Sequence, residues 1–490
     1  MALAHELSRF GTQESAVRRC AQVRTALIKA GLYNPGDEAA PSTSGNRWRI
    51  SPEPFLISAD EWSFLQTLGV HLLAFCRATN RLYFDSVQGS QPAWVAGYLD
   101  QGKPESLVTF GRMKRFRDSL PDIIRPDLIP TENGMIITEL DSVPGGIGLT
   151  DCLSTIYHDF ATQAGEQLNL VGGRDGMGAG FAKMVRNHRF EKSGCLAIVV
   201  SDEAKEYRPE MSWLAARLRD LGVDSYCVEP REIRFTEDRL LVESGTGLRP
   251  VSVLYRFFEL FDLKNVPKSE LIMYSAKKDR VTVTPPFKPA LEEKSAFALF
   301  HHPVLTPFWK RELGKDTFDL LSRMIPRTWI LDPRPLPPSA VIPNLHLGGR
   351  AVSQWQDLAS ASQRERRFVI KPSGFSELAW GSRGVSVGHD LPLTKWAESL
   401  DAALQAFSTT PSVLQEFHKG RQFDLSYYDP ETERLVSMPG RARLSPYYVV
   451  SGDSTELGGI LATVCSPDKK VIHGMRDAIM APCAITPEAR

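Results

Sequence analysis

The spacing of apolar and polar positions changes along the chain and divides it into regions. Residues 1–120 are expected to be mainly helical, because the stretch from Trp62 to Leu73 places apolar residues at helical intervals. Residues 121–190 are expected to begin with a pair of strands. The turn Asn133-Gly134 is a strong hairpin signal, and residues 134–141 follow it as the second strand.

Strand and helix patterns alternate between residues 191 and 265. Residues 195–200 form a continuous apolar run, as in a buried parallel strand, and residues 251–256 form another. An amphipathic helix is expected between them, over residues 210–221. This order predicts a small doubly wound, Rossmann-like unit, which places ligands at the C-terminal ends of its strands.

Residues 266–490 begin with helical patterns and continue mostly as strands. Residues 332–338 are rich in proline and are expected to form a stiff connector. Strands are expected at residues 368–371 and 412–417. A chain of 490 residues exceeds the size of a single core, so two or three lobes are expected in a mixed α/β (α+β) fold.

Composition and charge argue against several classes of function. The formal net charge is zero, which argues against a nucleic-acid or membrane-surface partner. No apolar run approaches the length of about 20 residues that spans a bilayer. The seven cysteines are scattered, which argues against a zinc site or a disulfide framework. With no signal sequence recognised at the start, we expect a cytoplasmic protein.

A lysine at the end of an apolar strand begins the most informative stretch. Lys371 is followed by a loop with Gly374, Gly381 and Gly384. A lysine held at a strand end suits phosphate oxygens, and glycines let backbone N–H groups approach them. The loop is not a Walker A motif, because no Gly-Lys-Ser/Thr closes it. An ordinary strand and surface loop is the alternative interpretation.

The hairpin strand ends in two acidic residues. Glu139 and Asp141 are two positions apart, so both side chains lie on one face of the strand. Paired carboxylates suit Mg²⁺ that bridges nucleotide phosphates. The alternative is a solvated acidic face.

Two further sets of residues complete the candidate nucleotide site. Gln415 and Glu416 end a strand, where they could face an adenine and a ribose. Arg256 ends the strand over residues 251–256, although an ion pair with Glu259 explains it equally well. Arg441 and Arg443 share one strand face, and ordinary surface pairing is their alternative role.

Glycines are also dense between residues 172 and 180. A dinucleotide-binding loop, and hence a dehydrogenase, would require a strand before them, and none is predicted. A flexible connection is the favoured interpretation.

The order of these motifs resembles that of circularly permuted ATP-grasp proteins, the group of glutathionylspermidine-synthetase-like and eukaryotic-type glutathione-synthetase-like enzymes. The acidic strand precedes the lysine strand by more than two hundred residues, which is the permuted arrangement. The segments that carry the resemblance are residues 125–127, 137–146, 251–256, 291–294, 368–372 and 414–417.

The resemblance implies domains at 1–120 (helical), 121–190 (part of the ATP-grasp core), 191–265 (Rossmann-like) and 266–490 (ATP-grasp lobes). It also implies an ATP- and Mg²⁺-dependent ligase that joins a carboxylate to an amine through an acyl-phosphate. Lys294 and Lys371 would hold phosphates, and Glu377 would add a third metal ligand to Glu139 and Asp141. The acyl-phosphate requires an arginine, for which Arg256, Arg441 and Arg443 are the candidates.

One residue departs from the family pattern. The metal strand of the family usually ends its Glu-x-Asn triplet in asparagine, whereas this chain has Asp141. A non-catalytic protein that keeps the ATP-grasp scaffold is therefore the alternative. Small-molecule or peptide carboxylates and amines are the expected partners, and the sequence sets neither their identity nor the oligomeric state.

Overall fold

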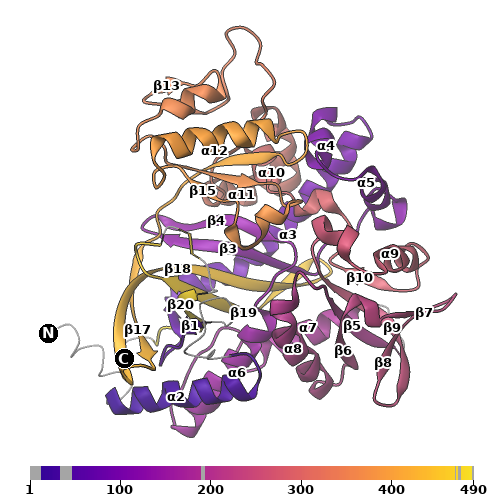
Figure 1. The fold of residues 1–490 in the computed structure, drawn as a ribbon, viewed down its shortest axis with the longest axis vertical. Coiled ribbons are helices and arrows are strands. Elements are labelled where there is room, and N and C mark those ends of the chain that lie inside the picture. Colours follow the sequence, from indigo (N-terminus) through magenta and orange to yellow (C-terminus); the bar gives the residue numbers. More distant parts are fainter. Residues whose placement is uncertain (1–12, 34–46, 189–193, 470, 473–475, 488–490) are drawn as a thin grey trace.

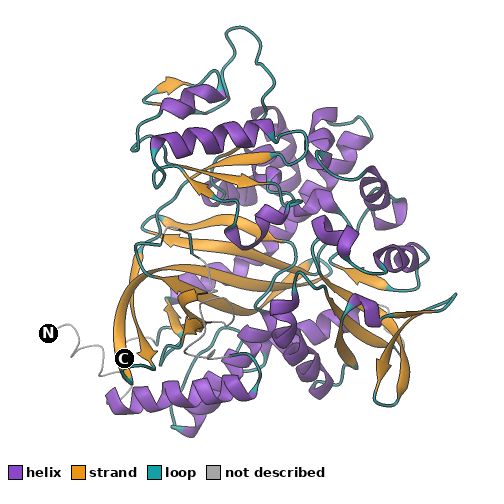
Figure 2. Cartoon of the chain, viewed as in Figure 1, coloured by secondary structure: helices purple, strands orange, loops and turns teal. Residues whose placement is uncertain are grey.

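The computed structural model of the protein describes residues 13–33, 47–188, 194–469, 471–472 and 476–487. Three main sheets and a two-stranded hairpin of β12 (His346–Leu347) and β13 (Arg350–Ala351) are joined and covered by helices (Figures 1 and 2). The mixed α/β prediction is confirmed. The α-helices are α2 (Gln13–Lys29), α3 (Ala59–Val87), α4 (Ala93–Asp100), α5 (Glu105–Gly111), α6 (Ile147–Gln163), α7 (Gly176–Asn187), α8 (Arg208–Asp220), α9 (Ser269–Lys277), α10 (Ser295–His301), α11 (Thr306–Met324) and α12 (Leu393–Gln405).

The largest sheet combines segments that are far apart in the sequence. Its order is β1-β20-β19-β18-β3-β4, with β17 paired to β18 and β2 paired to β20. The predicted hairpin is confirmed as β3 and β4, and β3 lies antiparallel to β18. The strands are β1 (Arg47–Arg49), β2 (Phe55–Ile57), β3 (Ile123–Thr131), β4 (Gly134–Asp141), β17 (Gln422–Asp429), β18 (Arg434–Ser451), β19 (Ser454–Cys465) and β20 (Arg476–Ile485).

Helix α3 packs closely on this sheet. It begins at a capping box, in which the Ser58 side chain accepts the N–H of Glu61 and the Glu61 carboxylate accepts the N–H of Ser58. A Cβ on Gly69 would overlap the side chains of Tyr448 and Thr455. The glycine therefore lets the helix backbone approach the sheet, which supports the predicted helical character of the N-terminal region.

The second sheet, here called the parallel unit, has parallel strands at residues 195–200 and 251–256 as expected, and β7 and β8 extend it in antiparallel fashion. Its order is β6-β5-β9-β8-β7, with β10 paired to β9. Strands β5, β6, β9 and β10 are parallel, and β5 is buried at every position. The strands are β5 (Cys195–Val200), β6 (Ser225–Val228), β7 (Arg234–Phe235), β8 (Leu240–Ser244), β9 (Gly247–Phe257) and β10 (Thr282–Thr284).

A small antiparallel sheet carries the lysine strand. Its order is β11 (Thr328–Ile330), β16 (Ser412–Glu416), β14 (Phe368–Pro372) and β15 (Ser386–Val387). One face packs on α12, where Phe368 and Ile370 join Trp396 in a core. Because side chains alternate along a strand, Val369 and Lys371 point to the opposite face. Figure 1 shows this sheet above the β3–β4 hairpin.

The glycines between residues 172 and 180 are part of the packed fold. The expectation of a flexible connection is wrong from Gly176 onward, where α7 begins. A Cβ on Gly172 would overlap the carbonyl oxygen of Gly458, and a Cβ on Gly176 would lie 2.6 Å from the same atom. Close approach to β19 therefore explains these glycines.

No helix among the described residues is both long enough and apolar enough to cross a membrane.

Gly172 and Gly173 provide a matched pair for testing this packing. Both have positive φ, +79° and +67°, but a Cβ on Gly173 would meet nothing within 4 Å. We expect Gly173→Ala to cost about 1–2 kcal/mol of unfolding free energy, which is the strain of the left-handed conformation. Gly172→Ala should cost clearly more, because its Cβ also meets backbone. Urea denaturation of both variants measures the difference, and equal losses would contradict the packing role.

Candidate functional site

A cleft of about 320 Å³ opens where the acidic strand, the glycine-rich loop and the parallel unit meet. A smaller cavity of about 50 Å³ shares Glu139, Leu140 and Lys294 with it. The charged and glycine residues that line the cleft include Arg125, Asp127, Glu139, Asp141, Glu206, Glu210, Glu259, Glu292, Lys294, Gly374, Gly381 and Arg443. Lys371 and Gln415 line the smaller cavity.

The two acidic residues of β4 each face a cation. Glu139 lies 2.9 Å from the Nζ of Lys294, and Asp141 pairs with Arg125. Arg125 stands opposite Asp141 in the register of β3 and β4, as Asp127 stands opposite Glu139. Arg125 and Asp141 therefore form a cross-strand pair of opposite charge, whereas Asp127 and Glu139 place two carboxylates opposite each other.

These pairs set the ionisation of the carboxylates. Burial by itself raises the pKa of Glu139, but Lys294 and Lys371 outweigh it and hold that pKa below its ordinary value. Burial also acts to raise the pKa of Asp127, but the attraction of Arg125 and Arg443 outweighs it and holds that pKa below its ordinary value. The pKa of Asp141 is raised, because its burial outweighs Arg125.

The lysine strand meets the acidic strand directly. The Nζ of Lys371 donates a hydrogen bond of 2.8 Å to the carbonyl oxygen of Thr138 on β4. Burial lowers the pKa of Lys371 to about 8, against the attraction of Glu139. Burial also acts to lower the pKa of Lys294, but Glu139 raises it above its usual value. Two cations from distant segments therefore lie beside one carboxylate.

The glycine-rich loop rests on the segment of residues 292–294. A Cβ on Gly374 would overlap the carbonyl oxygen of Glu292. The hydroxyl of Ser373 donates to Glu293, whose carboxylate also lies 2.7 Å from the Nζ of Lys103. The side chains of Lys103 and Glu293 are almost completely buried. The start of the loop is therefore fixed against this segment.

The remaining loop residues occupy different surroundings. Gly381 lines the cleft. A Cβ on Gly384 would crowd Pro372 and Leu378, so this glycine serves the packing of the loop itself. Glu377 is exposed at the start of the short 3-10 helix η9 (Glu377–Ser382) and is absent from the described lining of both cavities.

The two residues proposed for adenine and ribose lie at the end of β16. Gln415 is buried, and its amide donates to the hydroxyl of Thr328 at 3.3 Å. Glu416 is half-buried and lies 4.0 Å from the ring of His418. Burial raises the pKa of Glu416.

The three candidate arginines separate into two groups. Arg443 lines the cleft and lies 3.2 Å from Asp127. Arg441 is buried and donates to the carbonyl oxygen of Pro467 at 2.9 Å. Arg256 is completely buried and pairs with Glu292, and not with Glu259, the partner in the alternative interpretation. Arg256 and Arg441 both lie outside the described cleft lining.

Arg125 and Glu210 are among the charged residues of the cleft to which the sequence interpretation assigns no role. Arg125 was noted only within a motif, although its alternation with Asp127 before a hairpin was a usable signal. No pattern in the local sequence indicated that Glu210 would reach the cleft. Its carboxylate accepts the N–H groups of Gly146 and Leu149, at 2.7 and 3.2 Å, and these lie at the start of α6. The contact joins two regions of the chain and depends on tertiary structure.

The cationic side chains at this site suit phosphate oxygens, and its carboxylates suit a hard cation. Lys294, Arg125 and Arg443 in the cleft and Lys371 in the smaller cavity provide positive charge, and within the described part of the chain the buried Nε atoms of both arginines have no hydrogen-bond partner. Carboxylate oxygens are the ligands that Mg²⁺ prefers. Among the described residues, however, no group of three or more His, Cys, Asp and Glu side chains is arranged to hold a metal ion.

Comparisons with known proteins connect this fold to solved structures. No protein-family model matches the chain, and no curated protein matches its sequence. A glutathione synthetase-like effector from Globodera pallida, solved in its apo form, superposes with a TM-score of 0.58. The two sequences are 10% identical, and the match covers 97% of this chain and 98% of the effector. The two proteins therefore share a fold over nearly their whole length.

A proposed gamma-glutamylcysteine synthetase from Methylobacillus flagellatus is more distant. Its TM-score is 0.41 at 11% identity, over 87% of this chain and 89% of that protein. This similarity is too low to indicate a shared fold.

Stability should depend on pH through Glu210. Burial raises the pKa of this carboxyl to about 7, against its two backbone hydrogen bonds. The folded protein then binds more protons than the unfolded chain between about pH 4.5 and 7, so this contribution to stability is lost as pH rises through that window. Glu210→Gln should flatten the slope of unfolding free energy between pH 5 and 7. An unchanged slope in urea titrations would remove Glu210 as its source.

Arg256 should be a stabilising residue. Arg256→Met would leave the carboxylate of Glu292 without its buried partner, and we expect a loss of about 3–5 kcal/mol in unfolding free energy. The double variant Arg256→Met/Glu292→Leu removes both charges and should recover most of the loss. Calorimetric melting separates these outcomes. A single variant that is as stable as the unmodified protein would show that the pair contributes nothing.

Proposed function

We propose that the protein is an ATP- and Mg²⁺-dependent ligase that joins a carboxylate to an amine. One observation carries the proposal, namely that Lys294 and Lys371 converge beside Glu139 where the lysine-bearing sheet faces the acidic strand. Cations and a carboxylate in one partly enclosed cleft suit a phosphate chain and its metal. The fold shared with a glutathione synthetase-like protein supports the same class of reaction.

In this proposal the chain's residues hold and neutralise charge. Lys371 and Lys294 bind phosphate oxygens, and Glu139 and Asp141 hold Mg²⁺, for which each must exchange its present ion pair. Reactions of this class activate a carboxylate as an acyl-phosphate, which the amine then converts to an amide with release of phosphate. Arg443, at the cleft, is the arginine best placed to stabilise that anion. The glycine-rich loop would exclude water.

The proposed domain organisation is that of a permuted ATP-grasp protein. The lobes would be residues 121–190 and 266–490, flanked by the helical region 1–120 and the Rossmann-like unit 191–265. Fold similarity does not name substrates. The partners are therefore proposed as small-molecule or peptide carboxylates and amines.

A nucleotide-binding protein without ligase activity is a second candidate. Asp141 stands where the family usually has asparagine, and it is paired with Arg125. That pair reduces the charge available to a metal. The two candidates differ in turnover, because only the ligase releases ADP when it is given a carboxylate and an amine together.

Nucleotide protection tests the proposed site. A ligand at about 100 times its dissociation constant stabilises a protein by about 2.7 kcal/mol, so Mg-ATP should raise the melting temperature by a few degrees. Lys371→Ala should abolish this shift. Lys395→Ala is the matched control, because Lys395 is exposed on α12 and pairs with Glu398.

The same preparations can be screened with pairs of carboxylates and amines for ADP release. Protection by Mg-ATP without release from any pair would favour the non-catalytic candidate. No shift with any nucleotide, or an equal shift in Lys371→Ala, would contradict the site.

A further inference from the structure

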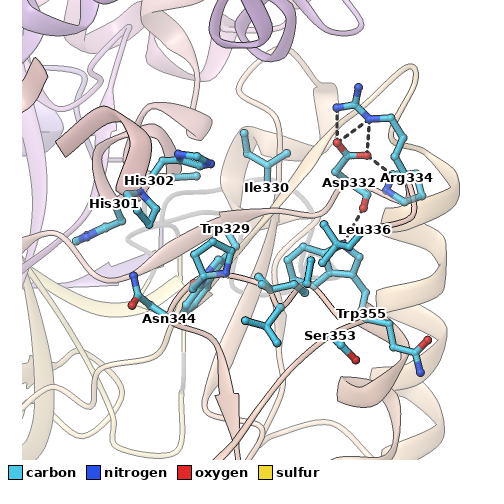
Figure 3. A pocket seen from close by; sticks show the side chains of 18 of the residues that line it. His301, His302, Trp329, Ile330, Asp332, Arg334, Leu336, Asn344, Ser353 and Trp355 are labelled. Carbon is cyan, nitrogen blue, oxygen red and sulfur yellow. Dashed lines mark hydrogen bonds and ion pairs between the residues drawn. The ribbon is translucent and has the colours of Figure 1, made fainter. Parts of the chain in front are cut away.

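A second and larger pocket lies away from the candidate cleft. Its volume is about 1070 Å³, and it shares no described lining residue with the cleft or the smaller cavity. Helices α4 and α10, strand β11 and residues 332–344 form its walls. In Figure 3, His302 lies on one side, Leu336 and Trp355 lie on the other, and Trp329 and Ile330 lie between them.

Aromatic rings line this pocket and are held in place. The rings of Trp94 and His302 pack with their centroids 4.6 Å apart. The indole N–H of Trp329 donates to a backbone carbonyl at 2.8 Å, and that of Trp355 donates to the carbonyl of Asp332 at 2.7 Å. Fixed aromatic rings provide surfaces for a flat ligand at little cost in side-chain entropy.

The charges in this lining are compensated. Asp332 pairs with Arg334 and accepts the hydroxyl of Tyr98 at 2.6 Å. Burial lowers the pKa of both His301 and His302, which keeps the two rings neutral near pH 7.

Arg327 is the remaining charged residue of the lining. It lies close enough to Glu416 to oppose the rise that burial causes in the pKa of that carboxyl. The pocket therefore lacks a buried, unbalanced charge that would select an ion, and an uncharged ligand fits it best.

Strand β11 contributes Thr328, Trp329 and Ile330 to the lining of the pocket. It is the terminal strand of its sheet. The carbonyl of Arg327 and the N–H of Leu331 both bond to β16, each at 2.9 Å. Antiparallel pairing alternates, so the backbone groups of Thr328 and Ile330 point away from β16. The carbonyl of Ile330 accepts the N–H of Asp332, which leaves the Thr328 carbonyl and the Ile330 N–H as an outward pair without a partner among the described residues.

A side chain near this edge also has unused hydrogen-bonding capacity. The Nδ1 of His302 is buried, and none of the residues that the structure describes forms a hydrogen bond with it. A buried polar atom without a partner is costly, and a ligand that bonds to it removes that cost.

We propose that this pocket is a second small-molecule site, for an uncharged planar ring compound with a lactam or amide edge. The ligand's N–H donates to the Thr328 carbonyl, and its C=O accepts the Ile330 N–H. Its ring packs against the aromatic walls. This site is independent of the proposed ligase activity, because it is formed by other residues.

Isoquinolin-1(2H)-one is a suitable probe, because it is neutral, flat and carries N–H beside C=O. Titration calorimetry on the full chain should detect its binding. The N-methyl derivative lacks the donor and should bind about tenfold more weakly, since one hydrogen bond is lost and an acceptor is left unpaired. Isoquinoline-1-carboxylate adds a charge and should also bind more weakly. Equal binding of the lactam and its N-methyl derivative, or no binding of any probe, would overturn the proposal.

Two substitutions at one position test the strand edge. Ile330→Pro removes the outward N–H and preserves the bonds to β16, and edge strands tolerate proline. Ile330→Val keeps the N–H and is the matched control. We expect about tenfold weaker lactam binding for proline and less than about twofold for valine.

Trp94→Ala should weaken binding as well, by removing a ring from the wall. Melting curves, with and without Mg-ATP, show whether each variant keeps the fold. A folded Ile330→Pro variant with unchanged affinity contradicts the proposal. If that variant does not fold, the comparison of the two probes decides the question by itself.

Discussion

Buried charge pairing at residues 292–294 is the constraint on which the arrangement of the lobes depends. The three side chains reach the parallel unit through Arg256, the glycine-rich loop through Ser373 and the acidic strand through Glu139. Removing such charges from water is expensive unless each finds a partner. The partners come from segments that are distant in sequence, so the charges can be satisfied together only when the lobes are assembled in this way. These pairs thereby link the formation of the cleft to the folding of the chain.

Pairing of opposite charges also explains why many charged side chains can line the cleft. Arg125 pairs with Asp141 across β3 and β4. The opposed carboxylates of Asp127 and Glu139 take their cations from other segments, Arg443 on β18 and Lys294. Each carboxylate is drawn toward a cation while burial opposes its ionisation, and the balance differs at Glu139 and Asp141. A ligand with phosphates and a divalent cation could exchange these internal pairs for its own at limited cost, because the surroundings are already polar and fixed.

The second pocket follows a different physical principle. Its charges are compensated, its aromatic rings are held by hydrogen bonds to backbone carbonyls, and a strand edge provides its polar groups. Thr328 on β11 lines this pocket and Gln415 on the neighbouring strand β16 lines the smaller cavity, and a hydrogen bond between their side chains connects the two linings. One small sheet thus borders both a charged cavity and a neutral pocket.

Local sequence determined the elements whose signals lie within a few residues. Asn133-Gly134 specified the hairpin, and the apolar run at residues 195–200 specified a buried strand, because turn chemistry and side-chain period act locally. Sequence order also placed an acidic strand and a lysine strand as possible partners, and the structure brings them together. Tertiary structure alone decided which distant groups meet. Arg256 pairs with Glu292, Gly374 lies against a backbone carbonyl, and the Glu210 carboxylate binds the start of α6. Those outcomes depend on the packing of segments far apart in the chain, and no local pattern encodes which of many similar charges will share a buried site.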